Sequence, residues 1–304
     1  MTKTILNNLQ RISIAAAAVL FLICAGAAAA EQGAPAAEGK RVAILKVMTI
    51  NLRHNKDFWE ERFPLIADEI VRLKPDLIGL QEMKIDIEQS KTLLAMIEQR
   101  GGADGYKYAK YEHVKTGGYM IQGEGVSIFS RFPIEKKGYA DLKEGRPAVF
   151  TRVNVADGLT VDFYNTHLHN QGGDEVRLAQ AKILVEYMNK NYAGFPAFLT
   201  GDMNSNDATG TIAYFIANSL IDSYRAFHGA ETAAAGNTSP VIISKDNAQQ
   251  DFANRIDYVF VKPPAGWQDR IKIVDSVVCF KNYDANGLYP SDHLGVMTTF
   301  EISY

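Results

Sequence analysis

The chain has 304 residues, of which 47% are hydrophobic and 22% are charged, a composition typical of a globular protein that buries a substantial core. Its formal net charge is −3, so it lacks the basic excess expected of a protein that binds nucleic acid tightly. A bound divalent cation would offset part of this negative charge at a site.

The first 30 residues have the pattern of a signal peptide. Lys3 and Arg11 give a positively charged start, and the stretch from residue 12 to 29 is apolar. Ala28-Ala29-Ala30 then offers a cleavage site before Glu31. We therefore expect an exported protein, either periplasmic or secreted. An uncleaved membrane anchor is the alternative, because the apolar run is long enough to span a bilayer.

After removal of the signal peptide, two parts of the chain are expected. Residues 31–39 are rich in Gly, Pro, Ala and Glu and predict a flexible lead-in, and residues 40–304 are expected to form a single domain. Removing the signal segment takes away two basic side chains and Cys24, so the formal net charge changes from −3 to −5. Cys279 then remains alone in an apolar strand pattern, which excludes a disulfide within the mature chain.

Apolar and β-branched runs, broken by Gly, Pro and Asp-Gly, predict many strands and few helices. In chain order, strands are predicted near residues 42–52, 76–82, 106–114, 125–134, 148–155, 159–168, 197–200, 255–262, 271–280 and 295–302. Helices are predicted near residues 63–73, 93–97, 174–189 and 211–219, the third with Val176, Ala179, Ile183 and Tyr187 on one face. Residues 229–254 are predicted to form a long surface loop that could border a substrate site. This pattern suggests one sheet packed on another, with helices outside.

Polar residues fall at the ends of these apolar strands. Asp202 and Asn204 follow the buried run 197–200, and residues two apart in extended backbone point to the same side. A carboxylate and a carboxamide aimed at one point suit a site for metal and phosphate, although Gly-Asp-x-Asn is also common in turns. Seven residues at or beside the ends of apolar strands share this chemistry: Asn51, Glu82, His167, Asp202, Asn204, Asp257 and His293.

Six short motifs occur in the order found in a known superfamily. They are Thr49-Ile50-Asn51-Leu52, Leu80-Gln81-Glu82, Asn165-Thr166-His167-Leu168, Gly201-Asp202-Met203-Asn204, Arg255-Ile256-Asp257-Tyr258-Val259 and Ser291-Asp292-His293-Leu294. In these motifs the chain resembles the endonuclease/exonuclease/phosphatase superfamily, which includes exonuclease III, DNase I, neutral sphingomyelinases and inositol polyphosphate 5-phosphatases. The resemblance implies an α/β (α+β) fold, a four-layer sandwich of two packed, mainly antiparallel β-sheets flanked by helices. It also implies Mg²⁺-dependent cleavage of a phosphoester by residues 40–304.

The resemblance implies a metal site built from Glu82, Asn51 and Asp292. Such oxygen ligands, without a Cys/His cluster, favour Mg²⁺, with Mn²⁺ or Ca²⁺ as alternatives, over zinc. Three other histidines are expected to be structural hydrogen-bonding residues: His54, His113 and His228.

Five further residues are expected to carry the chemistry. Asp202 would orient or deprotonate the attacking water, and Asn204 would hold a phosphate oxygen. His293 would contact the scissile phosphate while Asp257 fixes its tautomer and favours its protonated form. His167 would donate to a non-bridging oxygen.

Substrate contacts are expected from Arg177, Asn170 and Arg131. The segment from His167 to Asn170, followed by Arg177, resembles a pattern of the phosphatase and phospholipase branches in which the arginine meets a phosphate. Asn170 stands where those relatives often carry histidine, and Arg131 matches a family arginine. Structural roles are the alternative for both arginines. No basic stripe interleaved with aromatic residues, as in a DNA-groove binder, is present in the sequence.

These patterns predict an exported phosphoesterase that hydrolyses a phosphodiester or phosphomonoester by metal-assisted in-line attack of water. The first alternative is an extracytoplasmic Mg²⁺-dependent nuclease acting on DNA or RNA, and the second is an inactive binding module on the same scaffold. The expected partner is a phosphoester in a small molecule, a lipid headgroup or a nucleic acid. No stable protein partner is implied, and a monomer is expected.

Overall fold

The computed structural model describes residues 40–102, 106–116, 122–229, 235–246 and 250–304, and Lys40–Tyr304 form one compact unit. The predicted signal peptide and lead-in, residues 1–39, lie outside the described residues. Among the described helices, none combines the length and the apolar character needed to cross a membrane.

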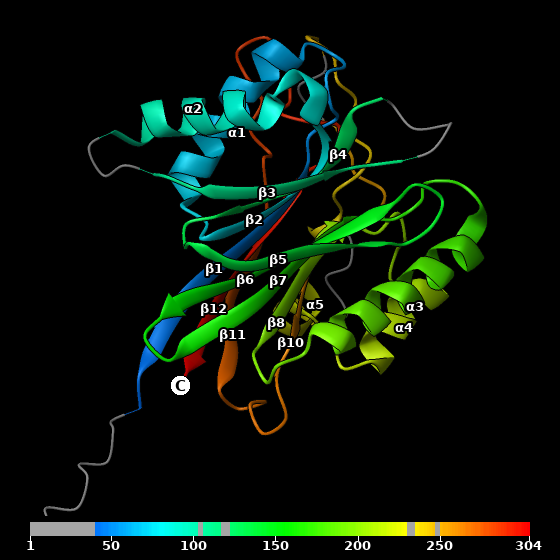
Figure 1. Ribbon diagram of the computed structural model, residues 1–304. Helices are drawn as coiled ribbons and strands as arrows, with labels where there is room; N and C mark the ends of the chain where they lie inside the picture. Colours follow the sequence, from blue (N-terminus) through cyan, green and yellow to red (C-terminus); the bar gives the residue numbers. More distant parts are fainter. Residues whose placement is uncertain (1–39, 103–105, 117–121, 230–234, 247–249) are drawn as a thin grey trace, which may run out of the picture. The chain divides into compact units, whose positions relative to one another are not determined.

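Two six-stranded sheets form the centre of this unit (Figure 1). Within each sheet one neighbouring pair is parallel, β1 with β2 and β7 with β8, and the other pairings are antiparallel. The first sheet has the order β11 (Ile271–Cys279), β12 (Gly295–Ser303), β1 (Val42–Asn51), β2 (Leu77–Lys84), β4 (Glu124–Ser130) and β3 (Ala109–Val114). The second has the order β5 (Ile134–Asp141), β6 (Pro147–Ala156), β7 (Leu159–His167), β8 (Ala197–Asp202), β10 (Asp257–Lys262) and β9 (Ile221–Asp222).

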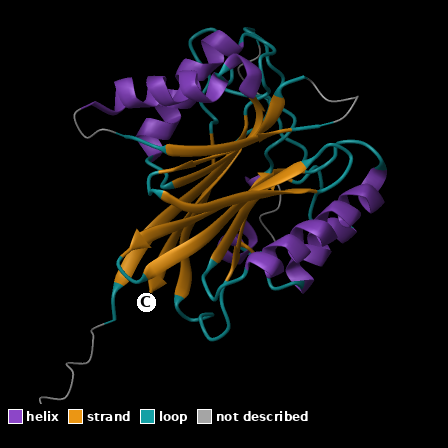
Figure 2. Ribbon diagram, in the orientation of Figure 1, coloured by secondary structure: helices purple, strands orange, loops and turns teal. Residues whose placement is uncertain are grey.

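Helices cover the outer faces of both sheets (Figure 2). On the first sheet lie α1 (Trp59–Leu73) and α2 (Gln89–Gly101), whose apolar side chains share a core cluster with β1 and β2. On the second lie α3 (Gly173–Asn191) and α4 (Gly210–Ala217), which share a cluster with β6, β8 and β10. A 3₁₀ turn, η1 (Ile85–Ile87), and a short helix, α5 (Ser223–His228), complete the elements of the described residues. The predicted four-layer sandwich is thus confirmed.

The side chains of β1 alternate between two apolar cores, one between the sheets and one under the helices. Leu45 and Val47 lie in the cluster between the sheets, whereas Met48 and Ile50 lie in the cluster under α1 and α2. Successive side chains of a strand point to opposite sides of the sheet. The side chain of Asn51, the last residue of β1, therefore points toward the second sheet. The same alternation governs the other central strands.

Strand β2 departs from this alternation at one place, and the departure changes the direction of the Glu82 side chain. In a regular strand Glu82 would share the helix-facing side with Ile78 and Leu80. A β-bulge lies between Leu80 and Met83, and Glu82 has a φ of 53°. Because the extra residue shifts the period, Met83 takes the helix-facing position and the Glu82 carboxylate turns toward the end of the sandwich.

Strand β5 and the buried face of α3 differ most from the predictions, and the short elements β9 and α5 were also not predicted. Strand β5 was not predicted, because it lies at a sheet edge and most of it, including Lys136 and Lys137, is exposed. Charged residues of this kind protect edge strands. The buried face of α3 is also rotated from the predicted one. Ala179 is exposed, and the helix instead buries Gln180, Ala181, Leu184, Val185 and Met188.

Candidate active site

The pairing of three strands brings three of the predicted residues side by side. In the parallel pair β7–β8, His167 is level with Asp202, and in the antiparallel pair β8–β10, Asp202 is level with Asp257. By the alternation of side chains along each strand, all three point toward the first sheet. Asn51 reaches them from β1 of that sheet, where its Nδ2 donates to Asp202 Oδ2 at 3.1 Å. Strand ends from both sheets therefore meet at one point.

The Asp202 carboxylate is the centre of this group. It is 1% exposed, and its Oδ1 accepts a hydrogen bond from the backbone N–H of Asn204 at 2.9 Å. Its Oδ2 faces two imidazoles, with His167 Nε2 at 3.4 Å and His293 Nε2 at 3.8 Å. Burial raises the pKa of Asp202, and the nearby His293 opposes that rise. The result is a carboxylate that is a stronger base than an exposed one.

His293 and Asp257 form a buried pair. His293 Nδ1 lies 2.9 Å from Asp257 Oδ2, and Asp257 is fully buried. Burial alone would lower the pKa of His293, but the carboxylates of Asp257 and Asp202 outweigh it and hold that pKa well above its usual value. The ring is therefore protonated near neutral pH, and Nδ1 donates to Asp257. The Nε2–H is then left to face Asp202 and the opening of the site.

His167, unlike His293, is neutral. Burial lowers its pKa well below the usual value, and the Lys115 ammonium adds to the effect. Lys115 Nζ lies 3.0 Å from His167 Nδ1 and also contacts Glu124 Oε1. Because an ammonium group only donates, His167 Nδ1 accepts and Nε2 carries the proton. The ring is thus neutral and presents an N–H toward Asp202.

A buried polar layer between the sheets supports these strand ends. Asn165 Nδ2 donates across the gap to the backbone oxygens of Leu80 and Ser127, both at 2.9 Å. Asn165 Oδ1 accepts from Gln81 Nε2 at 2.6 Å. The sheets approach so closely here that a Cβ on Gly79 would lie 2.5 Å from Asn165 Oδ1. Only glycine fits at that position, and the contact fixes the spacing of the two sheets beneath the site.

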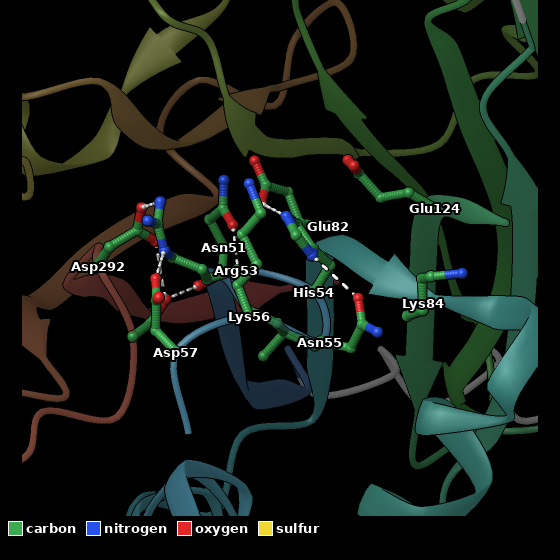
Figure 3. Close-up of polar contacts among 12 residues, drawn as sticks. Asn51, Arg53, His54, Asn55, Lys56, Asp57, Glu82, Lys84, Glu124 and Asp292 are labelled. Carbon is green, nitrogen blue, oxygen red and sulfur yellow. Dashed lines mark hydrogen bonds and ion pairs between the residues drawn. The ribbon is translucent and has the colours of Figure 1, made fainter. Parts of the chain in front are cut away.

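Glu82 lies beside this centre with His54 and Glu124 (Figure 3). Each of the three offers a ligand atom, and these atoms lie within 4.8 Å of one another. Glu82 keeps 21% of its side chain exposed, whereas His54 and Glu124 are each 5% exposed. Carboxylate oxygens and an imidazole nitrogen in such a cluster fit a divalent cation.

Asp292, the second carboxylate of the predicted metal site, forms an ion pair with Arg53. Its Oδ2 lies 2.5 Å from Arg53 Nη1, and Arg53 Nε also contacts Asp57 (Figure 3). Asn51 Oδ1 accepts from the backbone N–H of Arg53 at 3.0 Å. Asn51 and Asp292 therefore both contact Arg53. Two groups of possible metal ligands occur among the described residues: one is His54, Glu82 and Glu124, and the other is Asp202, Asp257 and His293.

Arg131 is not brought to the site. It follows β4, where its backbone N–H donates to Asp76 O, its Nη1 donates to Asp76 Oδ1 at 3.1 Å and its guanidinium stacks over Tyr106. Asp76 precedes the first residue of β2, whereas Glu82 lies near the other end of that strand. Six residue steps of extended chain separate Asp76 from Glu82, a distance of roughly 20 Å. The structure supports the structural role for Arg131 and not the substrate contact.

The remaining predicted residues border the centre and have protein partners. Arg177 Nε donates to Ser205 Oγ at 2.9 Å, so it ties α3 to the loop after β8. Asn204 Nδ2 donates to the backbone oxygen of Leu168 at 3.0 Å. Asn170 Oδ1 accepts from Arg146 Nη2 at 3.0 Å, which places Asn170 at the wall of a cavity.

That cavity has a volume of about 250 Å³, and the described residues that line it are all polar or charged. Arg146 is 3% exposed, and its Nε and Nη1 have no hydrogen-bond partner among the described residues. A buried guanidinium with unused donors is an anion-binding group. The lining consists of Arg53, His54, Lys56, Glu82, Lys115, Glu124, Arg146, His169, Asn170 and Gln171.

Sequence reasoning missed four members of this site: Lys115, Glu124, Arg146 and His54. Lys115 and Arg146 follow or precede strands at positions with no motif of their own, and charged residues at strand ends are ordinarily solvated. The only signal for His54 was its position three residues after Asn51, which is weak by itself. Their burial depends on the way the two sheets pack, which no local pattern records.

The model of the family described as Endonuclease/Exonuclease/phosphatase family matches residues 48–293. The chain belongs to the endonuclease/exonuclease/phosphatase family. The predicted resemblance is thereby confirmed, and members of this family are metal-dependent hydrolases that act on phosphoesters.

Among curated proteins, a putative neutral sphingomyelinase of Caenorhabditis elegans is 25% identical over 268 residues, covering 75% of this chain and 58% of that protein. The chain thus spans less than two thirds of that relative.

Two solved structures from Bacteroides thetaiotaomicron share the endonuclease/exonuclease/phosphatase fold. One, described as an endonuclease/exonuclease/phosphatase family protein, has a TM-score of 0.67 at 23% identity and covers 86% of this chain and 96% of its own. The other is described as a mannosyl-6-phosphatase and has a TM-score of 0.65 at 23% identity, covering 84% of this chain and 99% of its own. At this identity the likeness establishes the fold alone.

Proposed function

We propose that this protein is an exported, divalent-metal-dependent phosphoesterase that hydrolyses its substrate by in-line attack of water. The observation that carries the proposal is the buried Asp202 carboxylate, which faces His167 Nε2 and His293 Nε2 at 3.4 and 3.8 Å. Phosphoester hydrolysis needs a base for the water and donors for the phosphoryl oxygens. Export rests on the signal-peptide pattern of residues 1–30.

The protonation states inferred for these side chains suit the reaction. Asp202, whose pKa burial raises, would take the proton of the attacking water at Oδ2. His293 would present its Nε2–H, backed by Asp257, to the phosphoryl oxygens as charge develops on them. His167 would donate its Nε2–H to a non-bridging oxygen. A divalent cation, when bound at the Glu82 carboxylate, supplies positive charge that stabilises the transition state.

The cavity beside the centre favours a compact, polar substrate. Its volume of about 250 Å³ corresponds to roughly eight water molecules at about 30 Å³ each, and it lies below the usual range of about 300–1,000 Å³ for drug-sized ligands. Its described lining includes no apolar side chain that would pack against a lipid chain. We therefore propose a phosphate ester of a small hydroxylated compound, with Arg146 on the phosphate. The name of the mannosyl-6-phosphatase agrees with this class.

A panel of phosphoesters tests the proposal. It would comprise mannose 6-phosphate, an inositol phosphate, sphingomyelin, plasmid DNA, p-nitrophenyl phosphate and bis-p-nitrophenyl phosphate, each with Mg²⁺, Mn²⁺, Ca²⁺ or EDTA. We expect hydrolysis of the small polar esters by the wild type with a cation, none with EDTA, and none by Asp202→Ala.

Three other outcomes would change the conclusion. Degradation of plasmid DNA in preference to the small esters would support the nuclease. Hydrolysis of sphingomyelin in preference to them would refute the proposed substrate class. No turnover of any substrate with any cation would support the inactive binding module. Export is tested separately, because the mature protein isolated from its native cells should begin at Glu31.

A further inference from the structure

The loop after β1 places a buried histidine against the Glu82 carboxylate (Figure 3). Arg53 and His54 both have positive φ angles, 56° and 34°, which L-residues adopt only where the surroundings hold them. The backbone oxygen of His54 accepts from Gln89 Nε2 at 3.0 Å, which anchors the loop to the start of α2. Glu82 is also in the left-handed region, at the bulge of β2. Two strained residues therefore aim their side chains at the same space.

The hydrogen bonding of the His54 ring leaves one nitrogen free to bind a ligand. Nδ1 lies 3.2 Å from Asn55 Oδ1, and because that oxygen only accepts, Nδ1 carries the proton. In the neutral ring, Nε2 then offers a lone pair. Glu82 Oε2 lies 3.8 Å from this nitrogen, and that oxygen also only accepts. Two acceptors that face each other in a buried site are stabilised by a cation between them.

The geometry of the cluster allows one cation to bridge these atoms. Ligand atoms of His54, Glu82 and Glu124 lie within 4.8 Å of one another. A cation with bonds of about 2.0–2.3 Å links two ligands that are roughly 3 Å apart in adjacent positions and about 4.5 Å apart in opposite positions. The 3.8 Å separation of His54 Nε2 from Glu82 Oε2 falls within that span. Glu124 uses Oε1 for Lys115, and its second oxygen can turn toward the cation.

We propose that His54 is a nitrogen ligand of the cation held by Glu82, so that the site prefers a first-row transition metal to Mg²⁺. This inference rests on the proposed function, because it concerns the same metal site. Imidazole nitrogen suits iron, nickel, copper and zinc ions, and Mn²⁺ is the weakest-binding divalent ion of this first-row series, whereas Mg²⁺ keeps oxygen ligands and several waters. It also changes the expectation of an all-oxygen site, in which His54 had only a structural role.

Mn²⁺ binding to the full chain, stripped of metal with EDTA, tests the inference directly. His54→Gln replaces the imidazole with an amide, and His113→Gln is the matched control, because His113 stacks on Tyr139 of β5 and has no place in the cluster. Calorimetry would give the dissociation constants of Mn²⁺ and Mg²⁺, and pulsed EPR would detect nitrogen bound to Mn²⁺. Urea unfolding would verify that each variant is folded.

We expect nitrogen coupling to Mn²⁺ in the wild type and in His113→Gln, and its loss in His54→Gln. The Mn²⁺ dissociation constant should rise about 10- to 100-fold in His54→Gln, in line with the usual effect of disturbing a metal site, and the Mg²⁺ constant should change much less. Coupling that is absent from the wild type, or that persists in His54→Gln, would overturn the inference. An equal loss of affinity for both ions would do the same.

The two proposals fail in different ways. If the wild type hydrolyses a phosphoester with a cation but His54→Gln binds Mn²⁺ as the wild type does, the role of His54 is refuted and the proposed function stands. If no cation supports hydrolysis, the proposed function is refuted whatever the EPR spectrum shows. Glu82→Gln separates these results further, because it should weaken the binding of both ions.

Discussion

Replacing Asp257 by asparagine should lower the pKa of His293 and with it the alkaline limit of activity. The pair is buried, and His293 Nδ1 lies 2.9 Å from Asp257 Oδ2. A hydrogen bond between charged groups contributes about 1.5–3 kcal/mol, and one pKa unit corresponds to about 1.4 kcal/mol. We therefore expect the His293 pKa to fall by about 1–2 units. The alkaline limb of kcat/KM should move down by the same amount.

The same change predicts a stability difference with a definite pH dependence. His293 has a folded-state pKa raised above its unfolded value of about 6.5. Its stabilisation is therefore fully present below about pH 6.5 and is lost as the pH rises through the folded-state pKa. Asp257→Asn should lower the free energy of unfolding by about 1.5–3 kcal/mol at pH 5.5, and the difference should shrink at alkaline pH.

Proton NMR titration of the imidazole signals, assigned with His293→Gln, measures the pKa, and urea unfolding measures the stability. Asp162→Asn is the matched control, because Asp162 is equally buried but pairs with Arg152 instead. It should cost stability without moving the His293 titration. A His293 pKa that is the same in Asp257→Asn and in the wild type would refute the reasoning.

Three further changes have different expected outcomes. Lys115→Met should destabilise the fold by about 3–5 kcal/mol in urea unfolding, because it leaves the buried Glu124 carboxylate without its partner; a loss below about 1 kcal/mol would contradict that pairing. Glu82→Gln should abolish the rise in melting temperature that a divalent cation gives the wild type, and an undiminished rise would move the metal site elsewhere. Arg131→Ala should leave kcat/KM within about twofold and cost at most about 1 kcal/mol, since its ion pair with Asp76 is partly exposed; a large loss of activity would return Arg131 to the substrate site.

The layered fold was predictable because its causes are local. Strands such as Val42–Asn51 are apolar on both faces, which requires a layer on each side, and the six motifs gave the family. The meeting of His167, Asp202 and Asp257 also follows from strand alternation once the strands are paired in register. In these cases a short stretch of sequence carries the information.

The rest of the site depends on features that arise only after the sheets pack. A bulge decides which way Glu82 points, and nothing in Leu80-Gln81-Glu82-Met83 marks it. Lys115 and Arg146 look like solvated strand-end residues, yet both are buried. Arg131 is the opposite case. Its place in the sequence matches a family arginine, but in the fold it lies at the end of the sheet away from Glu82.

The most direct test of the central claim is the single-turnover rate of phosphoester cleavage by Asp202→Asn, compared with the wild type at the same saturating cation. Asparagine keeps the size of the side chain and removes the base, and general-base catalysis contributes about 10²- to 10⁴-fold. We predict a loss of that size, with the cation still bound and the fold intact. A rate within about tenfold of the wild type would contradict the assignment of Asp202 as the base.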